Sequence, residues 1–484
     1  MIQRPTRRVL LRTAGGALAA AGLGHDIHAA EPAASPVITR LSAYMSAAGG
    51  RALPGEVLEK TKHHVLDTLA AMISGVGLAP GRVALQFARA HAGEHTATIV
   101  ASKVLSGAIE AAMVNGMLAH SDETDDSHAP SHSHPGCAVV PAALAAGEQF
   151  AIDGSRFLRA VALGYDVGPR VTTTLGGLPW QMESHRSAHS IAGTFGAAAA
   201  AGSAAGLSAQ QMRWLLDYAG QQASGIAAWQ RDTEHIEKSL VFAGMPARNG
   251  VSAALLIQLG GTGVDDIFSG ADNFLMSSSP QADPAQLIDK LGERYEVTRT
   301  NIKKWTVGSP IQAPLDALEN LRKRHPFEAA VVSRVAVRLA TSEAKTVNDR
   351  EMPDISLQYM VAVMLLDKTA SFAAAHDRSR MRDGAVQREK AKVQLIPDEE
   401  LERLYPRRET VVEVTLTDGT KLTERVGAVR GTAENPMTRE EVVAKCRDLM
   451  APVLGAAGAE KLIGRVLELE KSKDIRELRP LLQA

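Results

Sequence analysis

The densest group of acidic and basic side chains in the sequence lies in one polar stretch, residues 120–136. Four carboxylates and four imidazoles occur there, together with two prolines. Apolar, helix-like sequence precedes this stretch at residues 108–118 and follows it at 138–146. A polar loop between two core helices has no packing reason to carry so many ionisable groups, so we interpret it as the centre of a site. Its ionisable residues are His120, Asp122, Glu123, Asp125, Asp126, His128, His132 and His134.

Two kinds of chemistry suit these side chains. Imidazoles and carboxylates bind divalent metals, and His132 and His134 with the nearby acids are plausible ligands. Histidine also titrates near neutral pH, and neighbouring carboxylates fix its tautomer and raise its pKa, as general acid–base catalysis requires. A solvated acidic loop with incidental histidines is the third interpretation. The spacing alone leaves all three open.

Further candidates lie outside the loop. Lys238 enters an apolar, glycine-rich segment, where it could pair with a substrate carboxylate or simply lay its stem on apolar surface. Residues 303–304 are both lysines and could add positive charge or belong to a surface patch. His185 and His189 precede an alanine-rich helix and could face the same cavity or only pack. A tyrosine in an apolar segment, such as Tyr359, is more often a core residue than a catalytic one.

Composition narrows the class of protein. A chain of 484 residues is long enough for two domains. Its net charge of −1 gives no electrostatic footprint for nucleic acid. The two cysteines, Cys137 and Cys446, are far apart and show no zinc-ligand spacing, so neither a disulfide framework nor a zinc site is expected.

The N-terminus resembles an export signal. The pair Arg7-Arg8 is followed by a weakly apolar run at residues 14–24 and by small residues near Ala30, as in twin-arginine signals. We therefore predict a signal peptide at residues 1–34 and a periplasmic location, with an unstructured basic tail and a cytoplasmic location as the alternative. The apolar run is too short to span a membrane. No later stretch is predicted to span one, so no stable membrane insertion is expected.

Residues 38–275 have helical periodicity. Pro141 suits the first turn of a helix, and Ser208 suits the N-cap of another helix at residues 209–220. The alanine- and glycine-rich run at residues 191–206 predicts a helix that a neighbouring backbone approaches closely.

The pattern changes near residue 300. Alternating residues predict strands at 331–339, 392–396, 412–416 and 421–426, and Asp418-Gly419 predicts a hairpin turn. The charge-rich segment 378–392 is predicted to be a solvated loop.

These patterns predict a mainly α fold with three parts after the signal peptide. We predict an all-α domain at residues 35–298 and a smaller α+β domain at 299–435. Residues 436–484 are helical again, and a helical end after an α+β insertion suggests that they rejoin the first domain.

The motifs together resemble the MmgE/PrpD family, which includes 2-methylcitrate dehydratase, cis-aconitate decarboxylase and iminodisuccinate epimerase. The resemblance begins with the acidic loop that ends in His134-Pro-Gly and covers roughly residues 40 to 470. It continues through Val140-Pro-Ala-Ala-Leu144, Gly164-Tyr-Asp-Val167, Gly193-Thr-Phe-Gly-Ala-Ala198, Gln222-Ala-Ser-Gly225, Lys238, Asn249-Gly250 and Ser356-Leu-Gln-Tyr359.

The resemblance implies a large all-α domain built from both chain ends, an inserted α+β lid, a site in the cleft between them and a homodimer. It also implies that neither a metal nor an organic cofactor is needed. The family's active-site pattern falls on Glu123, Ser127, His134, Lys238 and Tyr359. Glu123 and Ser127 stand where the family usually has Asp and Thr, and Gly308 stands where it has a histidine.

The resulting hypothesis is a cofactor-independent lyase that removes water from, or decarboxylates, a small polycarboxylate. Such a reaction needs a base for a carbon-bound proton, a cation for the developing enediolate and an acid for the leaving group. The predicted catalytic residues are His134, Lys238, Tyr359 and Glu123. The predicted substrate-binding residues are Ser127, Asp126, His189 and Gly308, and no metal ligands are predicted.

Two alternatives remain open. The missing histidine at Gly308 favours simple reprotonation, which would make the protein an epimerase or isomerase of a carboxylic acid. A non-catalytic carboxylate-binding protein on the same fold is the other alternative. Solvent deuterium in recovered substrate, without an alkene product, would distinguish the first alternative from a lyase.

Overall fold

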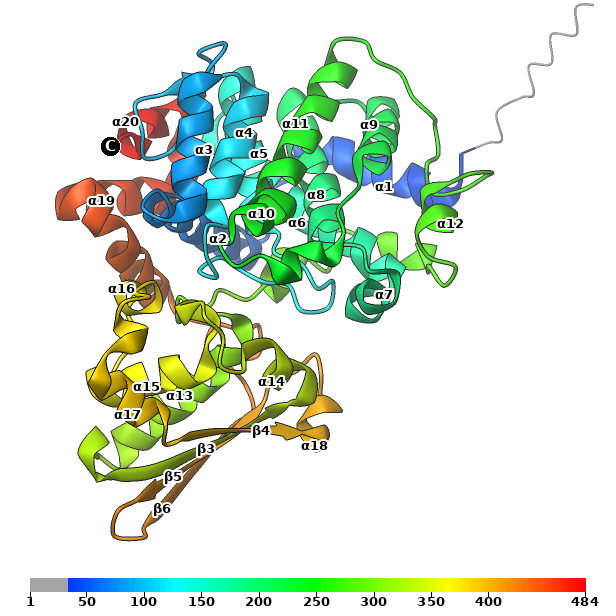
Figure 1. Cartoon of the computed structure of the whole chain (residues 1–484). Coiled ribbons are helices and arrows are strands. Elements are labelled where there is room, and N and C mark those ends of the chain that lie inside the picture. Colours follow the sequence, from blue (N-terminus) through cyan, green and yellow to red (C-terminus); the bar gives the residue numbers. More distant parts are fainter. Residues whose placement is uncertain (1–33) are drawn as a thin grey trace, which may run out of the picture. The chain divides into compact units, whose positions relative to one another are not determined.

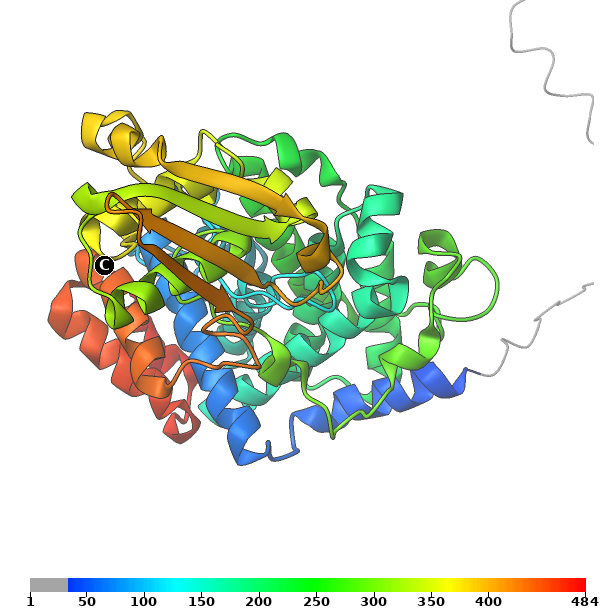
Figure 2. The same ribbon diagram turned by 90° about the horizontal axis from the view of Figure 1, so that it is seen from below.

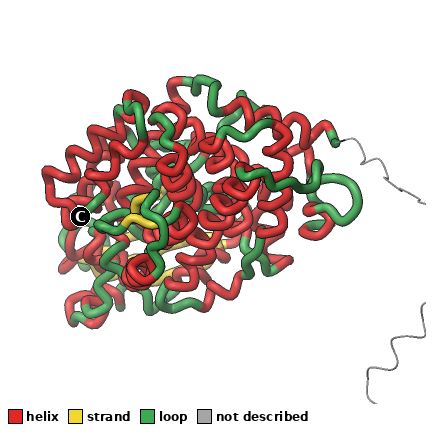
Figure 3. Tube along the Cα trace, turned by 90° about the horizontal axis from the view of Figure 1, so that it is seen from above, coloured by secondary structure: helices red, strands yellow, loops and turns green. Residues whose placement is uncertain are grey.

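The structure is a computed structural model that describes residues 34–484. The predicted signal peptide therefore lies outside the described residues, apart from its last residue. Helices make up 61% of the fold and strands 9%, so the prediction of a mainly helical protein is confirmed. Figure 3 shows this balance, with helices filling most of the view. Two hydrophobic cores organise the described part of the chain, and we call them the first and second core.

The first core is helical. It takes its buried apolar side chains from residues 38–302 and again from residues 437–482. A short hairpin of β1 (Ala97–Thr98) and β2 (Leu105–Ser106) lies beside these helices. The helices are α1 (Pro36–Ala48), α2 (Gly55–Gly75), α3 (Ala79–Ala90), α4 (Ala108–Ala119), α5 (Gly136–Phe150), α6 (Gly154–Leu175), α7 (Gly177–Ser184), α8 (Ala188–Ala205), α9 (Ala209–Gln222), α10 (Ile236–Ser239), α11 (Met245–Gln258), α12 (Phe274–Ser278), α19 (Arg439–Leu467) and α20 (Arg479–Leu482).

Helix α8 is the central helix of the first core and packs against α5, α6 and α11. Its small side chains allow the close approach that the sequence predicts. A Cβ added to Gly168 of α6 would lie only 2.3 Å from the carbonyl oxygen of Ala192 in α8. The glycine is needed there because any larger residue would push the two helices apart.

The C-terminal helix α19 completes the first core by packing along α2. Lys445 of α19 forms an ion pair with Asp67 of α2, with 2.6 Å between Nζ and Oδ1. The same ammonium donates a hydrogen bond to the carbonyl oxygen of Thr124, 3.0 Å away, in the acidic loop. Residues from the end of the chain therefore hold both an early helix and the loop.

The second core, formed by residues 305–429, combines a four-stranded sheet with helices. Figure 1 shows it below the helices of the first core, and Figure 2 shows the strands in front of their covering helices. Helix α13 packs on β5 and β6, and α15 packs on β4. The strands are β3 (Val332–Ala340), β4 (Val393–Asp398), β5 (Thr410–Leu416) and β6 (Lys421–Val426), and the helices are α13 (Ser309–Arg324), α14 (Thr341–Val347), α15 (Leu357–Asp367), α16 (Phe372–Ala375), α17 (Gly384–Lys390) and α18 (Glu399–Glu402).

The strand order is β4-β3-β5-β6, with β3 and β4 parallel and the other pairs antiparallel. Alternation sets the register: Val412 and Val414 of β5 are fully buried, whereas Glu413 between them is not. Gly419 has a φ of 88°, as the tight turn between β5 and β6 requires. The four strands and the hairpin turn predicted from the sequence are all present.

Two local predictions are wrong. Helix α5 does not begin at Pro141 but at Gly136, so the proline lies inside the helix, where it removes one backbone hydrogen bond. The segment 378–392 is not only a loop, because it contains α17, which buries Val386 and Glu389 on one side. A helix of seven residues is too short for its periodicity to stand out among charged residues.

One helical run has the length and hydropathy of a membrane span, which the sequence reading did not anticipate. It consists of α10, a π-helical turn (Leu240–Gly244) and α11, and its mean hydropathy is 1.4. In the structure, 61% of the most apolar part of this run is buried, and α11 packs against α4 and α8. Core helices of water-soluble proteins meet the same test, so we assign no membrane span to it. The bent pair α2–α3 meets it only if two helices at 85° are counted as one span.

Candidate active site

The acidic loop connects α4 to α5, and Asp126 holds it in place. One carboxylate oxygen of Asp126 accepts hydrogen bonds from His64 Nδ1 (2.8 Å) and from the hydroxyl of Tyr165 (2.5 Å). The other accepts from the backbone N–H of Gly136 at the start of α5, 3.0 Å away. This buried carboxylate therefore ties the loop to α2, α5 and α6.

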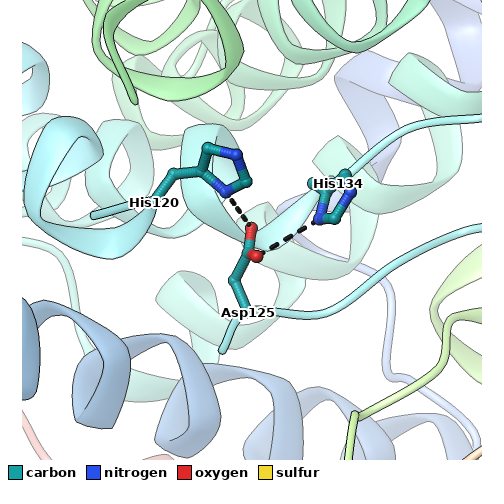
Figure 4. A group of neighbouring side chains, drawn as sticks. All are labelled: His120, Asp125 and His134. Atoms are coloured by element: carbon teal, nitrogen blue, oxygen red, sulfur yellow. Dashed lines mark hydrogen bonds and ion pairs between the residues drawn. The ribbon is translucent and has the colours of Figure 1, made fainter. Parts of the chain in front are cut away.

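The next carboxylate along the loop, Asp125, holds two histidines (Figure 4). His120 Nδ1 lies 2.9 Å from its Oδ2, and His134 Nδ1 lies 3.2 Å from its Oδ1. Burial alone would raise the pKa of Asp125, but the interactions with His120, His134 and Lys303 outweigh it and hold the pKa well below its usual value. Because Asp125 is ionised, both Nδ1 atoms carry the hydrogen and donate it. Each imidazole is thus oriented through Nδ1, and its Nε2 takes no part in this contact.

Burial keeps His134 neutral. It lowers the pKa of His134, and the positive charge of Lys303 reinforces it against the opposing effect of Asp125. In the part of the chain that the structure describes, no group hydrogen-bonds the Nε2 of His134. The Nε2 of His120 is likewise buried without a partner among residues 34–484. Asp125 thus positions two imidazoles, of which His134 is neutral, and the Nε2 of each is still available.

Glu123 brings two cations to the same place. Its carboxylate pairs with Lys238 of α10, and Lys303 lies 3.4 Å from its second oxygen and 3.6 Å from Asp125. Burial raises the pKa of Glu123, but the attraction of Lys238 and Lys303 outweighs it, so the pKa lies well below its usual value. The same carboxylates raise the pKa of Lys303 against the effect of its own burial. Lys303 therefore remains charged although it is buried, and it shares the carboxylate of Glu123 with Lys238.

Aromatic side chains pack against the histidines of this charged group. Phe242 stacks on His120, with ring centroids 4.7 Å apart, and on His189, at 3.9 Å. Phe242 lies in the π-helical turn, a rare element that is found mostly at functional sites. Burial, with smaller contributions from His132, His134 and Lys238, holds the pKa of His189 well below its usual value, so this ring is neutral too.

Two histidines at the site have strained backbones. His132 has a φ of 50° and His235 a φ of 63°, in the left-handed region that side chains other than glycine rarely adopt. Each such residue costs on the order of 1–3 kcal/mol, and residues of this kind cluster at functional sites. The ring of His235 lies 5.1 Å from that of His120, and its Nε2 is buried without a partner within residues 34–484.

The second core contacts the loop through His376, which follows α16. Its Nε2 lies 2.9 Å from Asp122 Oδ2. Burial lowers the pKa of His376, but the interaction with Asp122 outweighs it and raises the pKa to about 9, so this pair is ionic at neutral pH. A cavity of about 300 Å³ lies beside the pair, lined also by His235 and Asp354.

Two groups of side chains have the composition of a metal site. His120, Asp125 and His134 form one and His120, Glu123 and His235 the other, each with ligand atoms within 4.8 Å of one another. In the first group, however, two Nδ1 atoms already donate hydrogen to Asp125. The ammonium groups of Lys238 and Lys303 also neutralise the carboxylates and would repel a cation. The arrangement suits a negatively charged ligand better than a metal ion.

Comparison with known proteins agrees with the motifs in the loop. The N-terminal domain of the MmgE/PrpD family matches residues 39–287, and the C-terminal domain of the same family matches residues 305–470. The chain belongs to the MmgE/PrpD family. The prediction from the sequence motifs is therefore confirmed.

Relatives within the MmgE/PrpD family carry a common name. The chain is 25% identical over 465 residues to a cis-aconitate decarboxylase-like protein of Aspergillus oryzae, covering 89% of this chain and 94% of that protein. It is 25% identical over 470 residues to the cis-aconitate decarboxylase of Aspergillus terreus, covering 89% and 92%. The human cis-aconitate decarboxylase is 27% identical over 456 residues, covering 89% and 91%.

The structure brings together four of the predicted site residues: Glu123, His134, Lys238 and His189. The first two come from the loop, Lys238 from α10 and His189 from the first turn of α8. Of the other histidine candidates, His185 is exposed and lies outside the group. The acid–base interpretation of the loop has geometric support, because the imidazoles of His120 and His134 are paired with the ionised carboxylate of Asp125.

Four predicted site residues have other surroundings. Tyr359 is fully buried in the second core, and its hydroxyl donates to the carbonyl oxygen of Ala374, 2.7 Å away. Asp126 uses both of its oxygens to anchor the loop. Ser127 is half-buried, and its backbone pairs with Asn301. Gly308 is buried at the N-terminus of α13, where its N–H donates to the carbonyl oxygen of Asp354. These contacts do not place Tyr359 or Asp126 where a substrate would reach them.

The prediction also missed several residues. Asp125, His120 and His235 were not assigned roles, although the first two belong to the loop that the sequence singled out. Lys303 is buried against Glu123, so its interpretation as part of a surface patch is wrong. The neighbouring Lys304 points elsewhere and pairs with Glu319. No local pattern distinguishes these two adjacent lysines.

Proposed function

We propose that this protein is a cofactor-independent lyase that acts on a small polycarboxylate by acid–base catalysis. The observation that carries the proposal is the pair of imidazoles that Asp125 holds by Nδ1, with the side chains of Lys238 and Lys303 beside them. Membership of the MmgE/PrpD family and relatives named cis-aconitate decarboxylase support the same reaction class.

In this proposal His134 exchanges a proton with a substrate carbon through its Nε2. Asp125 fixes the ring in the tautomer that leaves this nitrogen unprotonated and stabilises the imidazolium that forms. The second imidazole, His120, offers its Nε2 to a substrate oxygen or a proton. A positioned acid or base of this kind contributes on the order of 10²–10⁴ in rate.

Lys238 and Lys303 supply the positive charge. They would bind a substrate carboxylate and stabilise the enediolate that develops when a neighbouring carbon loses a proton or carbon dioxide. In the structure Glu123 pairs with both ammonium groups. A substrate carboxylate would share or take over these contacts, so Glu123 is the residue that holds the two lysines in position for it.

We further propose that the α+β part, residues 299–435, acts as a lid over a helical domain built from both chain ends. The ion pair between His376 and Asp122 supports this arrangement, because it joins the second core directly to the acidic loop. Tyr359 would then support the lid from within its core rather than contact the substrate.

The test begins with a panel of small carboxylates: cis-aconitate, citrate, 2-methylcitrate and malate. We expect at least one to raise the melting temperature of the purified protein and to be turned over, detected as carbon dioxide release or as a change in alkene absorbance. His134→Gln should lower kcat on the order of 10²–10⁴-fold while the melting temperature stays near that of the wild type. The matched control is His95→Gln, because His95 is exposed and far along the chain from the loop. Unchanged turnover in the His134 variant would remove this residue from the mechanism.

An epimerase or isomerase is the second candidate, and Gly308 is the observation that favours it. A glycine at this buried position offers no side-chain acid to a leaving group. Solvent deuterium in recovered substrate, with neither alkene nor carbon dioxide formed, would establish this activity. Stabilisation by a carboxylate without exchange or turnover would instead indicate a binding protein.

The remaining proposals concern the location and assembly of the protein. We propose export by the twin-arginine route, which a fusion of residues 1–35 to a reporter would test by its appearance in the periplasm. Retention of the reporter in the cytoplasm would contradict it. We also propose a homodimer, which light scattering of the purified protein would test.

A further inference from the structure

The cavity beside the acidic loop holds one carboxyl group that has no partner. Asp354 lines this cavity of about 300 Å³ and is only 4% exposed. Its carboxyl group makes no hydrogen bond or ion pair with any residue from 34 to 484. The loop carboxylates Asp122, Glu123 and Asp125 all have such partners. A buried carboxyl group that faces a cavity without a partner is costly unless it is neutral or meets a ligand.

The backbone of Asp354 is nevertheless well held. It lies in a short 3-10 turn, Pro353–Ile355, and its carbonyl oxygen accepts a hydrogen bond from the N–H of Gly308, 2.9 Å away. Gly308 has no side chain to offer, whereas the neighbouring Asp354 lines the cavity. The position of the carboxyl group is therefore fixed by the fold.

The neighbouring acid–base groups are already engaged. His376 donates from Nδ1 to the carbonyl oxygen of Phe372, 2.7 Å away, and its Nε2 lies against Asp122. Asp122 also accepts hydrogen bonds from the N–H and the hydroxyl of Thr124, at 2.9 and 2.6 Å. Asp122 is ionised and has no proton to donate, and His376 cannot give up its proton without breaking the ion pair. Asp354 has no such bond to break.

The surroundings also leave Asp354 partly protonated. Burial is the main cause that raises its pKa, to about 6, and the negative charges of Glu123 and Asp122 reinforce it, whereas His376 and Lys238 oppose it. About half of the molecules then carry the proton at pH 6 and about a tenth at pH 7. The other ionisable groups that line the cavity include His235 and Arg378.

We propose that Asp354 is a further catalytic residue, the proton donor of the lyase reaction, which faces the substrate from the second core. This inference rests on the proposed function. In an elimination, His134 takes the carbon-bound proton, the C–H electron pair forms the double bond, and the C–O bond breaks. The leaving hydroxyl takes the Asp354 proton and departs as water. In a decarboxylation, the bond to the carboxylate breaks, carbon dioxide leaves, and the electron pair passes to a carbon that takes the Asp354 proton. A solvent proton then restores the carboxyl group.

The test compares wild type, Asp354→Asn and Asp272→Asn on the carboxylate that the panel identifies. Asparagine keeps the shape of the side chain but has no acidic proton. We expect Asp354→Asn to lower kcat on the order of 10²–10⁴-fold and to change KM only a few-fold. The kcat of the wild type should fall as the pH rises above about 6, and the variant should lack this decline. Asp272 is the matched control because it is exposed, and its positive φ suits asparagine.

Two results would overturn the inference while leaving the proposed function intact. One is Asp354→Asn turnover close to that of the wild type when His134→Gln is inactive. The other is an unchanged pH profile in the variant.

A second measurement does not depend on turnover. A carboxyl group whose pKa is higher in the folded protein stabilises the fold at low pH and loses that contribution as the pH rises through about 6. The melting temperature of Asp354→Asn should therefore rise relative to that of the wild type between pH 5 and pH 8. If the two proteins show parallel profiles, Asp354 is ionised throughout and cannot be the donor, whatever substrate is found.

Discussion

Asp125 and Asp126 are neighbours in the sequence, yet they organise two different regions. Both are buried, and both accept a hydrogen bond from the Nδ1 of a histidine. Asp126 faces α2 and α6, where His64 and Tyr165 use it as an anchor. Asp125 faces a different group of side chains, in which His120 and His134 lie beside Lys303.

The difference between the two regions lies in the partners of each carboxylate. Around Asp126, a phenol, one imidazole and a backbone N–H donate hydrogen bonds, and these contacts fix the loop. Around Asp125, two imidazoles lie beside the ammonium group of Lys303. Two adjacent and equally buried carboxylates can therefore organise groups of very different chemistry.

The largest expected effect comes from replacing Asp125. An asparagine has one accepting oxygen, so it can hold only one of the two imidazoles in the required tautomer. Asp125→Asn should lower kcat on the order of 10³–10⁴-fold, the size seen when a catalytic histidine loses its orienting carboxylate. Steady-state kinetics on the identified substrate would measure it, and Asp126→Asn is the matched control. A variant that keeps more than about a tenth of the activity would show that Asp125 is another anchor.

The converse substitution tests the anchor. Asp126→Asn should lower the free energy of unfolding by roughly 2–4 kcal/mol, because a buried charged acceptor of several hydrogen bonds is lost. The kcat of the protein that remains folded should change less than tenfold. Denaturant unfolding followed by fluorescence would give the first quantity, and kinetics at low temperature would give the second. Normal stability with lost activity would reverse the roles that we assign to the two residues.

A third carboxylate, Asp122, extends the comparison across the two cores. Its partner His376 has a pKa raised to about 9. The ion pair therefore stabilises the fold fully below about pH 6.5, the ordinary pKa of histidine, and this contribution is lost as the pH rises through about 9. The difference corresponds to roughly 3 kcal/mol. The melting temperature of the wild type should therefore fall more between pH 7 and pH 10 than that of His376→Gln. His325→Gln, at an exposed histidine of the second core, is the control. Equal falls in all three proteins would show that the pair contributes nothing.

The smallest expected effect is that of chelation. If Asp125 binds only the two imidazoles and no metal ion, EDTA should leave both the melting temperature and kcat of the wild type unchanged. A ligand that stabilises the folded protein would shift its melting temperature when removed. A fall of several degrees that zinc or manganese reverses would mean that His120, Asp125 and His134 hold a metal ion.

Local signals in the sequence predicted much of the fold. Alternation and the Asp418-Gly419 turn predicted the strands of the second core, and Ser208 predicted the N-cap of α9, where a capping box is present. The family motifs located the loop. These features depend on neighbours along the chain, which a sequence shows directly.

The pairings inside the site could not be predicted in the same way. Lys303 and Glu123 are separated by 180 positions, and His64 and Asp126 by 62. Sequence pattern identifies ionisable residues but does not say which of them meet after folding. For the same reason the sequence predicted that Asp126 binds substrate and that Tyr359 is catalytic, whereas in the structure Asp126 anchors the loop and Tyr359 packs in the second core.

The contact between Lys445 and Thr124 has a consequence for the order of events during synthesis. A ribosome that has made the first 430 residues has produced the whole acidic loop but not the helix that holds its Thr124 carbonyl and pairs with Asp67. Until α19 emerges, the part of α2 that packs on α19 has no cover. The helical body can therefore mature only after translation is nearly finished, and the nascent chain needs protection from aggregation during that interval.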